Sequence, residues 1–294
     1  ARPYTHREFL KMWKKCEEFV GESTDDIETT KHVRGANHSL SPEDTDGQTK
    51  AQYGRLLPRA MKTMMKKILC LDRKDVFLDI GHGLGNTCLQ AAFTAGCEAR
   101  GIEVVFSRNS IAGVFRDNMM IQHRNKRPSS PRIVGEVNLR HGRLEDDIHR
   151  DFLTKGVTRA YVNNFNGVFA DRSIKNNCVW FLDDYVAGLF ALMAPGAIMV
   201  TLHPLNLGPT QEEANRIRRK HNLFESSNAS FFSVEQVLLG KACDTVKWNQ
   251  HSGNSNDIFV YKYTRLPQQA GPDSVFMCCN PVCELAQIGA AISA

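Results

Sequence analysis

The sequence predicts an α/β protein with a mostly parallel, doubly wound sheet, an antiparallel pair of strands at one edge, and a small helical segment at the N-terminus. Three observations support this. Short apolar runs alternate with stretches of helical periodicity between residues 76 and 202. A glycine-rich turn joins the first run to the first of these helices. After Pro204, two strand-like runs follow without a required helix. Strands separated by helices are typical of right-handed βαβ units and a parallel sheet.

The first expected element is a helix over residues 5–20, where apolar side chains recur at helical spacing: Phe9, Met12, Trp13, Cys16, Phe19 and Val20. A polar linker follows over residues 21–48. A second helix is expected from Pro58, because the fixed φ of proline suits the first helical position.

The alternating region contains five expected strands, at 76–80, 99–104, 137–144, 159–165 and 197–202. Helices are expected at 86–96, 106–125 and 178–193, the last ended by Pro195 and Gly196. A short helix at 211–220 precedes strands at 231–240 and 257–263, which we expect to pair antiparallel at one edge of the sheet.

Composition limits the class of protein. The 294 residues are 42% hydrophobic, enough for an ordinary core. No run of about 18 apolar residues occurs and the N-terminus lacks the apolar centre of a secretory signal, which argues against a membrane or secreted protein. Nine scattered cysteines without a CxxC pair indicate a reducing compartment. The cluster of Cys278, Cys279 and Cys283 lacks a second ligand pair, so no metal site is predicted.

The net charge of +5 permits contact with nucleic acid or another acidic surface but does not require it. Short basic patches occur at 62–67, 123–127 and 216–220. They lack the interleaved aromatic residues of single-strand binders. We therefore interpret them first as solvated helix faces.

The segment DIGHGLGN, residues 79–86, follows the first expected strand and spaces its glycines GxGxG. The dinucleotide fingerprint has GxGxxG spacing, and a Walker loop ends in GK[ST], which is absent. Asp79 at the strand end would repel a pyrophosphate and suits a ligand with a cationic group. Glu103 ends the second strand, where an acidic side chain accepts hydrogen bonds from ribose hydroxyls. Together these residues favour S-adenosylmethionine, ahead of a tight turn beside a surface glutamate and ahead of NAD.

VNNF, residues 162–165, ends the fourth expected strand and faces the same crevice. Methyl transfer mainly requires alignment of an unprotonated nucleophile, which Asn163 and Asn164 could provide beside the apolar Phe165. An apolar channel beside a sulfonium lowers the pKa of an acceptor lysine. The alternative is that the two asparagines only terminate a strand.

With DIGHGLGN, Glu103, HGRLED and VNNF in this order, the chain resembles the non-SET histone H3 lysine methyltransferases named for disruptor of telomeric silencing, the Dot-one family. It resembles a divergent member, most like those of protists. The resemblance covers about Tyr53 to Tyr263. It implies the class I S-adenosylmethionine-dependent methyltransferase fold, with an N-terminal helix and linker at 1–49, a catalytic domain at 50–265 and a tail at 266–294.

The resemblance also implies the site residues. The expected cofactor-binding residues are Tyr53, Gly54, Asp79, Gly81, Gly83, Asn86, Glu103, Arg143, Leu144 and Asn163. The expected catalytic residues are Asn163, between cofactor and lysine channel, Phe165, and Trp248 as a wall of that channel; a tryptophan in a strand is also common in a core.

Three departures from the family stand out. Asn86 replaces a usual glutamine, and YGRLLP replaces YGETS. Arg143 and Leu144 occupy the places of the Asp and Phe that hold the adenine. Either the backbone and Leu144 contact that ring, or Glu145 or Asp146 takes the Asp role.

The implied function is methylation of a lysine in the globular core of histone H3, presented by the nucleosome in the nucleus, with possible DNA contacts through the basic patches. Two other hypotheses are an amino-group methyltransferase acting on nucleic acid and a chromatin-binding module without activity. A cofactor-dependent thermal shift separates the last from the enzymes, and the labelled acceptor separates the two enzymes.

Overall fold

The computed structural model describes residues 1–20, 55–125, 131–144, 146–164, 172–175, 178–205, 232–241, 246–247 and 257–267. The predicted linker, the predicted helix at 211–220 and all but the first two residues of the predicted tail lie outside these ranges. Among the described helices, none is long and apolar enough to cross a membrane.

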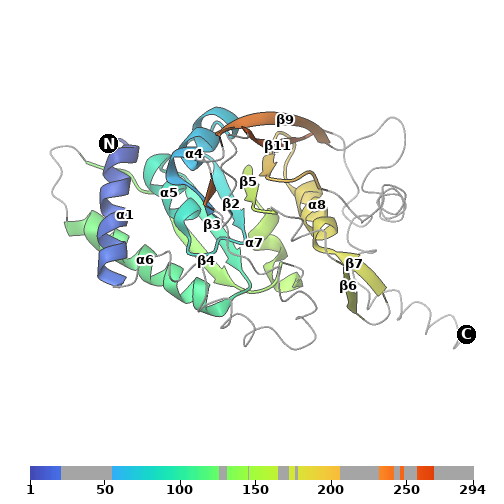
Figure 1. Ribbon diagram of the computed structural model, residues 1–294, viewed down its shortest axis with the longest axis horizontal. Helices are drawn as coiled ribbons and strands as arrows, with labels where there is room; N and C mark the ends of the chain where they lie inside the picture. Colours follow the sequence, from blue (N-terminus) through green and yellow to red (C-terminus); the bar gives the residue numbers. More distant parts are fainter. Residues whose placement is uncertain are drawn as a thin grey trace, which may run out of the picture.

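A seven-stranded sheet forms the centre of the described structure (Figure 1). Its strand order is β4 (Val137–His141), β3 (Glu98–Glu103), β2 (Val76–Ile80), β5 (Arg159–Val162), β8 (Ile198–Thr201), β11 (Asp257–Arg265) and β9 (Phe232–Lys241). The first five strands are parallel. Strand β11 runs antiparallel to β8, and β9 runs antiparallel to β11. The predicted mostly parallel sheet with an antiparallel edge pair is confirmed.

Helices cover both faces of this sheet. One face carries α1 (His6–Val20), α5 (Asn86–Thr94), α6 (Phe106–Asn125), and α4 (Pro58–Thr63), which continues as the π-helix η2 (Met64–Ile68). The other face carries α7 (Arg150–Thr154), after the 3-10 turn η3 (Asp147–His149), and α8 (Leu182–Leu192).

The two-residue period of the strands divides the core between these faces. Phe77 packs in the cluster with α5, whereas Leu78 and Ile80 pack in the cluster with α8. Asp79 follows Phe77 on the α5 face, so its side chain lies under the start of that helix, where Thr87 contacts it. The apolar strand β2 thus places the side chain of Asp79 near the edge of the sheet where the parallel strands end.

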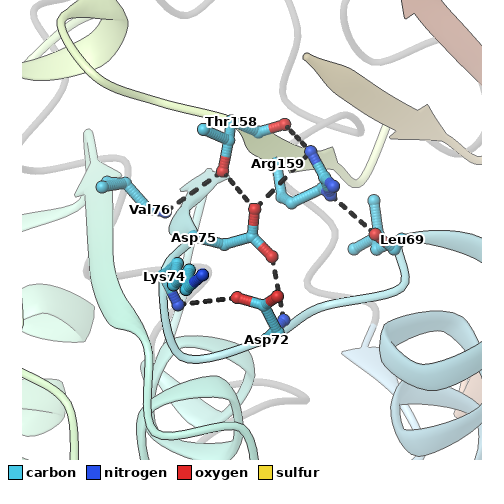
Figure 2. A network of polar contacts seen from close by, with 7 residues as sticks. All are labelled: Leu69, Asp72, Lys74, Asp75, Val76, Thr158 and Arg159. Atoms are coloured by element: carbon cyan, nitrogen blue, oxygen red, sulfur yellow. Dashed lines mark hydrogen bonds and ion pairs between the residues drawn. The ribbon is translucent and has the colours of Figure 1, made fainter. Parts of the chain in front are cut away.

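A polar network ties together the amino ends of β2 and β5, far from that edge (Figure 2). The buried Asp75 accepts hydrogen bonds from the Asp72 N–H at 2.8 Å and the Thr158 hydroxyl at 2.7 Å. Arg159 pairs with Asp75 at 3.6 Å and donates to the Leu69 carbonyl at 2.7 Å. The network fixes the relative position of the two strands whose opposite ends form the candidate site.

Two expectations from periodicity were wrong. Cys178–Phe181 were expected to begin a helix but form β7, which pairs antiparallel with β6 (Arg172–Lys175). Val, Trp and Phe favour strands, and an apolar run alone does not distinguish the two states. Phe19 was expected on the buried face of the first helix but is 70% exposed, because the sheet-facing contacts of α1 end at Cys16.

Smaller differences concern length and missed elements. Strand β5 ends at Val162, three residues before the predicted end. The η3–α7 segment was not predicted, since it spans too few residues to show a period. Strand β1 (Arg55–Leu56) pairs with β10 (Val246–Lys247), which local sequence did not indicate.

Candidate functional site

The glycine loop lies at the carboxyl edge of the sheet, between β2 and α5. Gly81, Gly83 and Gly85 have φ values of +80°, +56° and +76°, a region that side chains with a Cβ rarely adopt. A Cβ on Gly81 would meet no described atom within 4 Å, so the loop is open on that side. A Cβ on Gly85 would lie 3.2 Å from Ala112 and Leu139. The three glycines therefore form a tight turn, and its backbone is accessible at Gly81.

Glu103 lies directly against this loop. One carboxylate oxygen accepts the N–H of Gly83 at 2.8 Å, and the other accepts the N–H of Val105 at 2.9 Å. The side chain is buried. Each carboxylate oxygen has capacity for a further hydrogen bond. The residue predicted to bind ribose hydroxyls is thus held in place by backbone amides and can still accept from a ligand.

Asp79 is the second carboxylate of the site. Its side chain is 2% exposed, and the Thr87 hydroxyl donates to one oxygen. The other oxygen, Oδ1, has no hydrogen-bond partner in the part of the chain that the structure describes. Burial raises the pKa of Asp79 to about 7; the Thr87 hydrogen bond opposes the rise, and the nearby charge of Glu103 adds to it. A cationic group beside Oδ1 would stabilise the ionised form.

His82, within the loop, was not predicted as a site residue. Its imidazole is 2% exposed, and Nε2 lies 3.2 Å from Oδ1 of Asn109 on α6. Burial lowers the pKa of His82, which keeps the ring neutral. A Cβ on Gly101 of β3 would lie 2.7 Å from the ring. The ring therefore packs over β3 and joins the loop to α6. In the sequence, the presence of a bulky histidine between two glycines of the loop was the feature that could have indicated this role.

The asparagines after β5 have different surroundings. Asn164 is buried and its amide bridges to the end of β8: its side-chain N–H donates to the His203 carbonyl at 3.0 Å, and its oxygen accepts the His203 N–H at 2.8 Å. Asn163 is half-buried at the end of β5. Asn164 thus holds two strand ends together, which leaves Asn163 as the candidate to contact a ligand.

The remaining described candidates border the same edge. Asn86 is the first residue of α5 and is buried. Arg143 and Leu144 follow β4 and are half-buried, with Leu144 against the α8-side core. The Gly142 N–H donates to the Glu103 carbonyl at 3.0 Å, which places this turn beside Glu103. Tyr53, Gly54, Phe165, Trp248 and Glu145 lie outside the described residues.

Comparison with known families identifies the chain. The family described as "Histone methylation protein DOT1" matches residues 43–230, more than half of the chain. This range includes the glycine loop, Glu103 and Asn163.

Individual relatives match shorter segments. A protein of Yarrowia lipolytica named "Histone-lysine N-methyltransferase, H3 lysine-79 specific" is 32% identical over 116 residues, 38% of this chain and 22% of that protein. A protein with the same name from Emericella nidulans is 47% identical over 53 residues, 18% of this chain and 10% of that protein. Another from Aspergillus fumigatus is 43% identical over 60 residues, 20% of this chain and 12% of that protein. The chain therefore spans less than a quarter of the length of these relatives. All three are fungal, and the affinity to protist sequences stays a prediction.

Among solved structures, a tRNA (m1A58) methyltransferase from Aquifex aeolicus aligns with a TM-score of 0.42 and 14% identity, covering 73% of this chain and 71% of that chain. The family match and the strand order both agree with the resemblance seen in the sequence. The chain belongs to the DOT1 family of histone methylation proteins and has the class I S-adenosylmethionine-dependent methyltransferase fold.

Proposed function

We propose that this chain binds S-adenosylmethionine at the glycine loop and methylates histone H3 within nucleosomes, at the lysine 79 that its relatives' names specify. The observation that carries the proposal is the grouping of Asp79, the open glycine loop and Glu103 at one sheet edge in a DOT1-family chain. Nuclear localisation follows from this substrate and is part of the proposal.

The residues fit the cofactor. S-adenosylmethionine supplies an electrophilic methyl group on a sulfonium, together with an ammonium and a ribose. The unpartnered Oδ1 of Asp79 offers a buried acceptor for a cation. Glu103 offers acceptors for hydroxyls, and Gly81 leaves room for close approach to the backbone. Two carboxylates without a described cation between them make this edge selective for positive charge.

Asn163 would orient the acceptor amine. An amide side chain at the end of β5 can hold a nitrogen lone pair in line with the transferring group, and such positioning contributes several kcal/mol. The neighbouring Asn164 keeps the strand end in place through its bridge to His203. Proton loss from the amine requires no general-base side chain, since water can take the proton. The roles of Phe165 and Trp248 as apolar walls belong to the same proposal.

Exposed lysines on the α4–η2 segment, Lys62, Lys66 and Lys67, support a contact with nucleosomal DNA. Their joint replacement by alanine is expected to reduce transfer to nucleosomes and leave transfer to free histone H3 unchanged. Equal loss with both substrates would contradict the DNA contact.

The test is mass spectrometry of recombinant nucleosomes after incubation with the protein and the cofactor. Asn163→Ala is expected to lower methyl transfer roughly a hundredfold while retaining a cofactor-induced thermal shift. Gly83→Arg is expected to abolish both methyl transfer and the thermal shift. It places a side chain at a residue with φ +56° and disturbs the hydrogen bond from the Gly83 N–H to Glu103. Asn118→Ala, on α6, is the matched control and should change neither.

Circular dichroism confirms that each variant is folded. Unmodified H3 together with methylated RNA or DNA would identify a nucleic-acid amino-group methyltransferase and refute the histone assignment. Nucleosome binding without any cofactor-induced thermal shift in the unaltered protein would identify a binding module.

A further inference from the structure

A groove of about 720 Å³ follows β4, at the end of the sheet opposite β9. Strand β4 contributes three consecutive residues to its lining, and α6 and α7 contribute from opposite faces of the sheet. Its lining includes Asn138, Leu139, Arg140, Arg116, Phe152 and Lys155. Because successive strand residues point to opposite faces, a groove lined by all of these follows the outer edge of β4. We call it the β4 groove.

The outer edge of β4 presents backbone groups for pairing. Toward β3, the Glu136 carbonyl accepts the Ala99 N–H at 2.8 Å, and the Gly142 N–H donates to the Glu103 carbonyl at 3.0 Å. Backbone groups alternate along a strand, so Leu139 and His141 direct theirs away from β3. In the described ranges, no strand pairs with that side of β4. The edge therefore offers hydrogen bonds to an extended chain.

Arg140 is one of four cations in the lining of the groove, which also includes the carboxylates of Glu98 and Asp151. Its guanidinium carbon lies over the Phe152 ring, 4.0 Å from the ring centroid, in a cation–π contact. Among the described carboxylates, none forms an ion pair with it. The N–H edges of the stacked guanidinium stay available for a carboxylate.

The other cations of the groove differ from Arg140. Arg100, from the neighbouring β3, pairs with Glu98 at 2.6 Å and donates to the Phe152 and Lys155 carbonyls at 2.9 Å. Arg116 pairs with Asp117 at 2.9 Å. Lys155 lies 3.6 Å from Asp151, but both side chains are at least 80% exposed, and water weakens the pair. Arg140 and Lys155 are thus the cations best placed to meet an acidic partner.

We propose that the β4 groove binds an acidic peptide in extended conformation, which adds to the sheet as a strand beside β4. The peptide backbone pairs with Leu139 and His141, and alternate acidic side chains meet Arg140 and Lys155 on the α7 face. The intervening side chains face Leu139 on the α6 side and are apolar. Nucleic acid fits less well, because duplex binding depends mainly on neutralising several phosphates, and Arg100 and Arg116 of the groove already pair with Glu98 and Asp117.

The probe is a fluorescein-labelled peptide of eight residues that alternates Glu and Val, titrated with the unaltered chain and followed by anisotropy. Saturable binding is expected, and the Lys/Val counterpart should not bind. Arg140→Glu should weaken binding by about tenfold or more, and Phe152→Leu should weaken it less. The matched control, Arg73→Glu, makes the same charge change at an exposed turn outside the groove and should leave affinity unchanged.

Backbone pairing has its own readouts. N-methylation of alternate peptide amides should abolish binding without a change in peptide charge. Amide hydrogen exchange at Leu139 and His141 should slow on binding, whereas exchange at Asn138 and Arg140, which face β3, should not. Equal binding of the N-methylated peptide would refute strand addition. Absence of peptide binding, with a DNA duplex that loses affinity in Arg140→Glu, would refute the acidic peptide as the occupant.

Discussion

At the residue scale, the glycine loop depends on space that another glycine provides. The His82 ring occupies the position where a side chain of Gly101 would lie, because a methyl group added there would be 2.7 Å from the nearest ring atom. The same ring reaches Asn109 through Nε2. Gly101 is therefore needed for room and not for an unusual backbone angle, since its φ is not in the left-handed region.

Gly101→Ala is accordingly expected to destabilise the fold by about 1–3 kcal/mol, the usual cost of overpacking a filled interior. Chemical denaturation measures this. Gly113→Ala is the matched control, because no described atom lies within 4 Å of its added methyl group and alanine favours a helix by up to about 1 kcal/mol. In a His82→Ala background, Gly101→Ala should lower the free energy of unfolding by a smaller amount. The loss should not vanish, because the added Cβ at residue 101 would still lie 2.9 Å from the Cβ of residue 82. An equal cost in both backgrounds would show that the ring is not the obstacle.

At the scale of elements, α1 is joined to the sheet's helical layer by aromatic packing. Trp13 stacks on Phe115 of α6 with ring centroids 4.5 Å apart and planes 9° apart. Figure 1 shows α1 alongside α6 at one end of the molecule. Glu8 pairs with Arg132 at 2.5 Å, which ties the start of α1 to the segment before β4. Residues far apart in sequence therefore form one hydrophobic core.

Trp13→Ala is expected to destabilise the protein by about 3–5 kcal/mol, because it leaves a cavity against Phe115. Phe19→Ala in the same helix is the control and should change the free energy of unfolding by less than about 0.5 kcal/mol, since its side chain is 70% exposed. Urea unfolding of both variants gives the comparison. Similar losses for the two would mean that helix propensity, not docking, determines the contribution of α1.

At the scale of the whole molecule, the buried carboxyl of Asp79 couples folding to pH. Its pKa is about 7 in the folded chain and about 4 in an unfolded chain. Between these values the folded state retains a proton that the unfolded state has lost. Its contribution to stability is thus fully present below about pH 4 and is lost as pH rises through about 7.

Asp79→Asn removes this titration. The stability of the unaltered protein relative to the variant is expected to fall by up to about 4 kcal/mol between pH 4 and pH 8, at about 1.4 kcal/mol per pKa unit. Urea unfolding at four pH values in this range measures the difference. Asn118→Ala on α6, which alters no titratable group, is the control and should show no comparable trend. A relative stability that rises with pH would mean that the folded state favours the ionised Asp79.

The sequence alone determined the features that depend on neighbours along the chain. The pattern of apolar residues predicted a strand at residues 76–80 and a helix at residues 106–125, and these are the bounds of β2 and α6 in the structure. Glycine spacing and strand-end acids located the loop and Glu103, which lie together because parallel strands end at one edge. The DOT1 family was also readable from the order of these motifs.

Tertiary structure alone decided what depends on distant residues. Whether Cys178–Phe181 form a strand, and whether Phe19 is buried, depended on the partners available in space. The bridge from the Asn164 side chain to the end of β8 required His203, 39 residues further along the chain. The raised pKa of Asp79 and an outer edge of β4 that no described strand covers arise only when the sheet assembles, because burial and strand order are properties of the folded chain and not of any local segment.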